Sequence, residues 1–120
     1  IAAVRLLVLA FLLFACSALA DEWKTADYAL LGGALTLLAI DYRQTVEIAK
    51  TQTYYEKNPI LGEHPSRGEI DRYFAAAVLG TAGISWLLPA QQRRYFLGGL
   101  VFIEAIIVIR NHRFGIRAEF

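Results

Sequence analysis

The chain has 120 residues, of which 57% are hydrophobic, and its 12 basic residues nearly balance its 11 acidic ones. The mean hydropathy of +0.43 exceeds what a soluble domain of this size usually carries. The balanced, dispersed charge gives no basis for nucleic-acid binding. The single cysteine, Cys16, can form neither an internal disulfide framework nor a cysteine metal site.

Four apolar blocks, each flanked by charged residues, divide the chain: Ile1–Ala20, Ala26–Ile40, Tyr73–Leu88 and Tyr95–Ile109. They predict one domain over residues 1–120, an all-α integral membrane bundle of four transmembrane helices. A block of about 15 residues rises only about 22 Å, less than the hydrocarbon thickness of about 30 Å, so each helix must extend into its polar flanks. We therefore expect helices over residues 24–50, 66–88 and 92–112, with an ordered inner loop over residues 51–65.

The first block permits two main interpretations. Arg5, the apolar run Leu6–Phe14 and the small residues Ser17–Ala20 before Asp21 form the pattern of a secretory signal peptide. If this segment is cleaved, three transmembrane helices are left, and if it is retained, it is the first of four. Lipid attachment at Cys16 is a third option, which the bulky residue two positions before it disfavours.

The distribution of basic residues predicts the topology. With the N-terminus inside, nine of the twelve Lys and Arg residues fall on the cytoplasmic side, and only Lys24, Arg93 and Arg94 fall outside. Aromatic residues mark the outer interface (Trp23, Tyr28, Trp86, Tyr95) and the inner one (Tyr42, Tyr73, Phe114). These patterns predict a multi-pass protein of the inner, cytoplasmic membrane with both termini inside.

The third helix has well-specified ends. Ser66 and Glu69 form a capping box, in which each side chain binds the backbone amide of the other residue. Pro89 stops the helix, and the short Pro89–Arg94 link predicts that the third and fourth helices form an antiparallel hairpin of packed neighbours.

Small residues predict close helix packing within a three-helix core formed by the second to fourth blocks. These residues are Gly33, Ala76, Gly80, Gly83, Gly98 and Gly99. The alternative interpretation is that Gly and Ala are simply common in membrane helices.

The segment from Asp41 to Phe74 holds most of the polar residues with candidate roles. They are Asp41, Gln44, Thr45, Asn58, Pro59, Gly62, His64, Ser66 and Glu69. Asp41, Gln44 and Thr45 share one helical face, and Asn58–Pro59 favours a turn. The structural interpretation is that these side chains satisfy the backbone of an ordered loop at the membrane edge.

The alternative is a site in which Asp41, Glu56, His64 and Asp71 converge as acid, base or metal ligands. Their spacing matches no known ligand motif, so we predict neither a metal ion nor a cofactor.

Glu104 lies about nine residues, or roughly 13 Å, from Tyr95 and so close to the bilayer midplane. A carboxyl group at this depth needs a partner, and Thr36 lies at a similar level, while Thr81 lies somewhat nearer the outer face. We expect Glu104 to lock the bundle through one of these hydroxyls. The functional alternatives are a proton relay and a contact with a cationic residue of a partner.

The middle of the chain resembles a group of small membrane proteins of Gram-negative bacteria and their prophages. The residues that carry the resemblance are Asp41, Gln44 and Thr45, then Tyr54–Gly62, then His64–Ser66 and Arg72–Phe74, and the ending Gly115–Phe120 is also similar. The resemblance implies a bacterial membrane protein, and it supplies neither an activity nor a catalytic residue.

Together these features predict a non-enzymatic accessory or assembly subunit. We expect its partners to be the lipid bilayer and either other membrane subunits or further copies of itself. Two alternatives stay open: a membrane-embedded enzyme with a polar site at Asp41, His64 and Asp71, and a phage-related protein of the holin or envelope type.

Overall fold

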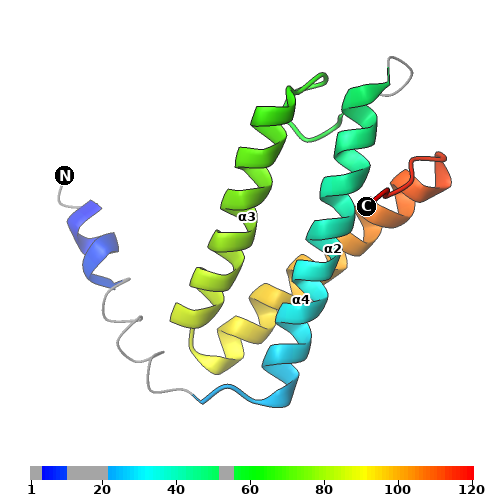
Figure 1. Cartoon of the computed structure of the whole chain (residues 1–120). Helices are drawn as coiled ribbons and strands as arrows, with labels where there is room; N and C mark the ends of the chain where they lie inside the picture. Colours follow the sequence, from blue (N-terminus) through cyan, green and yellow to red (C-terminus); the bar gives the residue numbers. More distant parts are fainter. Residues whose placement is uncertain (1–3, 11–21, 52–55) are drawn as a thin grey trace.

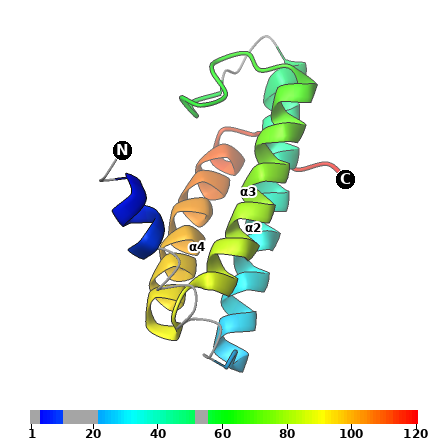
Figure 2. The same cartoon turned by 90° about the vertical axis from the view of Figure 1, so that its left-hand side faces the viewer.

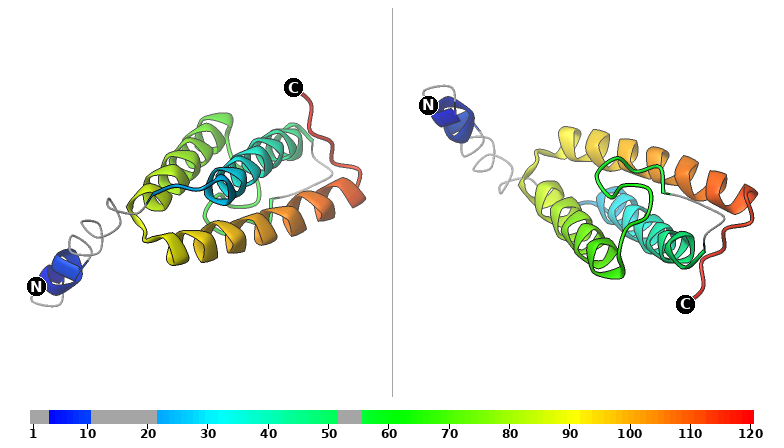
Figure 3. Two further views of the ribbon diagram at one scale, coloured as in Figure 1. Left: turned by 90° about the horizontal axis from the view of Figure 1, so that it is seen from below. Right: turned by 90° about the horizontal axis from the view of Figure 1, so that it is seen from above.

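The computed structural model describes residues 4–10, 22–51 and 56–120. All regular structure in these ranges is helical, as predicted: residues 4–10, α2 (Thr25–Lys50), α3 (Arg67–Leu87) and α4 (Ala90–Arg113) (Figure 1). Helical residues 4–10 lie apart from the other three helices (Figure 3). Cys16, the cleavage-like Ser17–Ala20 and residues 52–55 of the expected loop lie outside the described residues.

The capping box at the start of α3 is confirmed. The Glu69 amide donates to Ser66 Oγ (3.2 Å), and the Ser66 amide donates to Glu69 Oε2 (3.0 Å). Two backbone donors that a helix start leaves free are thereby satisfied. At the other end α3 stops at Leu87, two residues before Pro89, whose ring prevents continuation.

Replacing Ser66 with Ala is expected to destabilise the folded chain by about 1 kcal/mol, because the Glu69 amide loses its acceptor. The change is measured by denaturant titration of helical circular dichroism. The Ser66→Asp variant is the matched control, because Asp also caps helices, and it should stay close to wild type. Equal losses in both variants would contradict a capping role.

Seen from the end of the bundle, α2, α3 and α4 lie at the corners of a triangle (Figure 3), and from the side α4 lies to the left of α3 and α2 (Figure 2). The helix α2 makes most of its contacts with α4 and fewer with α3, while α3 and α4 diverge from their shared turn. The predicted short turn joins α3 to α4 and the two helices contact each other, but each of them packs more extensively against α2 than against the other. The reason lies in α4, whose buried residues Leu97, Glu104 and Asn111 recur every seven positions and form a stripe toward α2.

The core between α2 and α3 consists of larger side chains: Leu38 and Val46 from α2, with Ile70 and Phe74 from α3. Small residues contribute little to packing within the chain. A methyl group on Gly33 would lie 3.8 Å from Val101 Cγ2, which shows a close approach of α4. No neighbouring atom lies within 4 Å of such a methyl group at the other predicted packing glycines, Gly80, Gly83, Gly98 and Gly99. Ala76 is exposed, so the predicted small-residue core is not how these helices pack.

Among the described helices, α4 alone is long and apolar enough to cross a membrane, with a mean hydropathy of 1.4 over its most apolar window. The structure thus supports one of the four expected membrane-spanning helices. Charged side chains interrupt the other two, in the C-terminal half of α2 and in the first two turns of α3.

Candidate functional site

Polar side chains fill the interface between α2 and α4, which we call the polar seam. It comprises Asp41, Gln44 and Thr45 from α2, and Glu104 and Asn111 from α4. Each of these residues is at most 9% exposed. The spacing of the three α2 residues places them on the same face, and the structure buries that face against α4.

Hydrogen bonds from side-chain amides connect α2 and α4 at one end of the polar seam. Asn111 Nδ2 donates to Gln44 Oε1 (3.2 Å), and Gln44 Nε2 donates to the carbonyl of Val108 (3.2 Å). Sequence reasoning missed Asn111. The signal that could have found it is its position seven residues after Glu104, on the same face of α4.

Two carboxyl groups meet in the middle of the polar seam. Asp41 and Glu104 lie within hydrogen-bond reach of each other, and the Thr45 hydroxyl donates to Asp41 Oδ1 (3.4 Å). Glu104 is 7% exposed, and its Oε2 atom is buried without a hydrogen-bond partner. A carboxyl pair of this kind can share a proton, because two adjacent negative charges repel each other.

This pairing corrects the prediction that Glu104 bonds to Thr36 or Thr81. Thr36 is exposed, and its hydroxyl donates to the Gly32 carbonyl of its own helix (2.7 Å). Thr81 is buried on α3, a helix from which α4 diverges. The Glu104 side chain instead faces α2, because it belongs to the stripe of α4 that packs there.

The loop between α2 and α3 contains the expected turn. Asn58 Oδ1 accepts the Ile60 amide (3.0 Å), and the Asn58 carbonyl accepts the Gly62 amide (3.0 Å). Gly62 has a φ of 81°, which glycine adopts at little cost. Glu56 Oε1 accepts the amides of Lys57 (3.1 Å) and Asn58 (3.0 Å), while Glu56 Oε2 is buried without a hydrogen-bond partner.

The four candidate catalytic residues do not converge. Asp41 is buried beside Glu104, and the negative charge of Glu56 acts on it. His64, in contrast, is exposed on the loop, and Asp71 is exposed on α3. Over residues 4–10, 22–51 and 56–120, no group of three or more His, Cys, Asp and Glu side chains has the geometry to hold a metal ion. The alternative of an acid, base or ligand cluster is therefore not formed by these four residues.

Asp71 belongs to a different group, which lies ahead of the apolar part of α3 and which we call the polar clamp. The Tyr42 hydroxyl donates to Asp71 Oδ1 (2.7 Å), and Arg67 donates to both Tyr42 (2.8 Å) and Asp71 (3.1 Å). The Tyr42 hydroxyl and the Arg67 guanidinium lower the pKa of Asp71. The polar clamp joins the C-terminal half of α2 to the start of α3.

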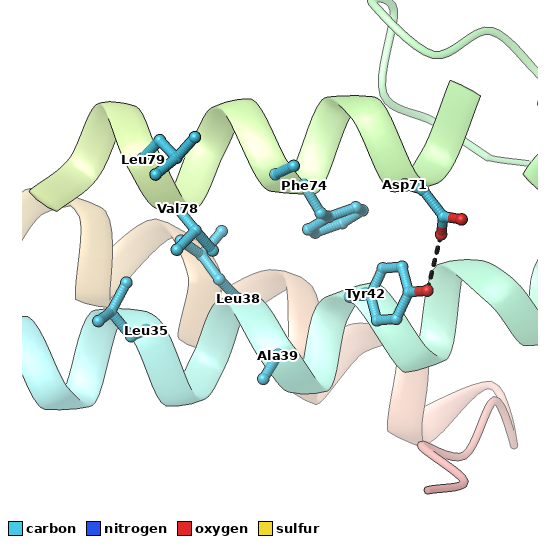
Figure 4. A pocket seen from close by; sticks show the side chains of 9 residues that line it. Leu35, Leu38, Ala39, Tyr42, Asp71, Phe74, Val78 and Leu79 are labelled. Atoms are coloured by element: carbon cyan, nitrogen blue, oxygen red, sulfur yellow. Dashed lines mark hydrogen bonds between the residues drawn. The ribbon is translucent and has the colours of Figure 1, made fainter. Parts of the chain in front are cut away.

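An apolar groove of about 510 Å³ runs between α2 and α3 and ends at Tyr42 and Asp71 of the polar clamp (Figure 4). Its remaining lining residues are Leu35, Leu38, Ala39, Phe74, Ala75, Val78 and Leu79. The volume falls within the range of about 300–1,000 Å³ that is usual for ligand pockets.

A buried ion pair closes the opposite end of the bundle. Arg93 is fully buried, with Nη1 3.5 Å from Asp27 Oδ2, and its guanidinium carbon lies 4.5 Å from the Trp23 ring centre. Its other nitrogens donate to the carbonyls of Ser85 (2.9 Å) and Leu88 (3.1 Å). This end group connects the starts of α2 and α4 to the end of α3. Sequence reasoning had placed Arg93 and Trp23 at the outer interface without finding the ion pair.

Comparison with known proteins adds no relative: no protein-family model, curated protein or solved structure matches the chain.

Proposed function

We propose that this chain is a small, non-enzymatic, multi-pass protein of the bacterial inner membrane. In this proposal it acts as an accessory subunit and presents the groove between α2 and α3 to an apolar transmembrane helix of a larger membrane complex. The observation that carries the proposal is this groove, which is open along one side and lined almost entirely by apolar side chains.

Large apolar side chains on the outer faces of α3 and α4 support a lipid environment. The exposed residues outside the groove are Ile84 and Trp86 on α3, and Phe102, Ile103, Ile106 and Ile109 on α4. Such extended apolar faces are unfavourable in water and natural in lipid. The length and hydropathy of α4 agree with this environment.

A helix fits this groove better than a side chain or a small ligand would. Ala39 and Ala75 line the groove, and Gly80 and Gly83 on α3 have open space around them. Small residues let two helix backbones approach closely in lipid, where packing rather than the hydrophobic effect drives association. Gly80 and Gly83 lie outside the groove lining, so the two alanines carry this argument.

The groove is tested by placing a photoreactive amino acid at Val78, beside the groove, or at Ile103, on the far face of α4. Both positions carry exposed apolar side chains, so they differ mainly in their relation to the groove. In native membranes we expect a discrete protein adduct from position 78 and only lipid adducts from position 103. Filling the groove with Ala39→Phe should abolish the adduct at position 78. Equal protein adducts from both positions, or lipid adducts alone at position 78, would contradict the proposal.

A further inference from the structure

The carboxyl pair in the polar seam has more acceptor oxygens than donors. Thr45 supplies one hydrogen bond to Asp41, and the amides of Gln44 and Asn111 are used on each other and on a backbone carbonyl. Glu104 is more than nine-tenths buried, and its Oε2 atom has no hydrogen-bond partner. Because buried polar atoms are almost always partnered, this oxygen indicates a missing donor or cation.

Within the part of the chain that the structure describes, the charged groups that act on Asp41 are acidic. Glu104 reaches it from α4 and Glu56 from the loop that follows α2, and Glu56 also has a buried oxygen without a hydrogen-bond partner. On its other side, α2 packs against α3 through apolar residues that include Ile70 and Phe74. Negative charge therefore accumulates here, and a cation would relieve it.

We propose that the Asp41–Glu104 pair is a binding site for one small monovalent cation, a proton or Na⁺. One proton shared between the two carboxyl groups leaves the pair with a single negative charge. The proposed cation binds in addition to this shared proton, next to Glu104 Oε2, and makes the site neutral, which an apolar environment strongly favours. Carboxylate and hydroxyl oxygens, which Asp41, Glu104 and Thr45 supply, are ligands that hard cations prefer.

An apolar carbodiimide tests this site, because it adds only to protonated carboxyl groups and is slowed when another cation replaces the proton. The full chain in lipid vesicles is labelled at neutral pH, and the adducts are located by mass spectrometry. We expect Glu104 or Asp41 to be labelled at least about tenfold more than the exposed Glu63, since an ordinary carboxyl group is almost fully ionised at this pH. Labelling no greater than that of Glu63 would overturn the proposal.

The same labelling experiment identifies the cation when it is carried out once in NaCl and once in choline chloride at equal ionic strength. The labelling of Asp41 and Glu104 is compared between the two salts. Protection by Na⁺ identifies a site for which Na⁺ and protons compete. Labelling that is lost with rising pH and is indifferent to Na⁺ identifies a proton site. Either result supports the proposal.

Two variants show whether the carboxyl groups act as a pair. In Glu104→Gln, Asp41 gains a neutral amide neighbour that can donate to its ionised form, so its labelling should fall severalfold at neutral pH. In Thr45→Val, which nearly preserves the side-chain shape, the ionised form of Asp41 loses a donor, so its labelling should persist to higher pH. Helical circular dichroism verifies that both variants fold. Unchanged labelling of Asp41 in both folded variants would contradict a paired site.

Discussion

Replacing Asp27 with Asn is expected to destabilise the folded chain by about 3–5 kcal/mol, because Arg93 is left buried without a counter-charge. Both side chains of this ion pair are fully buried. The nearby carbonyls and the Trp23 ring still contact the guanidinium, but they carry no full negative charge. Unfolding is followed by titration of the detergent-solubilised chain with a denaturing detergent, using Trp fluorescence, since Trp23 and Trp86 lie together at this end (5.8 Å).

Arg94 provides the matched control for this prediction. It also bonds to Asp27 (3.1 Å), but its side chain is 39% exposed, so Arg94→Gln should cost less than about 1 kcal/mol. The double variant Asp27→Leu with Arg93→Met should recover most of the loss, because an apolar pair needs no counter-charge. A loss from Asp27→Asn no larger than that from Arg94→Gln would show that the buried ion pair contributes little.

Replacing Phe74 with Ala is expected to destabilise the chain by about 3 kcal/mol, through lost packing in the core between α2 and α3. Phe74 is buried, and its ring meets those of Tyr42 (5.5 Å) and Tyr73 (5.0 Å) edge to face. Because Phe74 also lines the groove, the same variant should weaken the photo-adduct formed from position 78. Stability is measured by the same titration.

The control is Phe102→Ala on α4, since Phe102 is 68% exposed and does not belong to the core between α2 and α3. We expect a change within about 0.5 kcal/mol. A loss comparable to that of Phe74→Ala would show that the outer face of α4 is covered by a further part of the chain or by a second copy.

The local features of the candidate site followed from short stretches of sequence. The capping box of Ser66 and Glu69 and the turn at Asn58 depend on atoms within four residues, so residue type and spacing were sufficient to predict them. Asp41 and Gln44 were placed on one face for the same reason, since helical periodicity fixes their relation.

Contacts between residues on different helices could not be predicted from short stretches of sequence in this way. Depth along the helices predicted Thr36, at a similar level, and Thr81, somewhat nearer the outer face, as partners for Glu104, whereas Asp41 was placed at the membrane edge. Asp41 and Glu104 come together only because α4 packs mainly against α2. The same packing buries Asp41 against α4, away from the exposed His64 and Asp71, so the alternative cluster of these three residues does not form.

The sequence by itself determined an all-helical chain with extended apolar surfaces, because helix ends and hydrophobic periodicity are local properties of the residues. The tertiary structure alone decided which faces meet, and with them the carboxyl pair of the polar seam, the buried ion pair of Asp27 and Arg93 and the groove beside α3. The physical reason is that the rotation and crossing of packed helices depend on the sum of many contacts between residues far apart in the chain. No single motif encodes that sum.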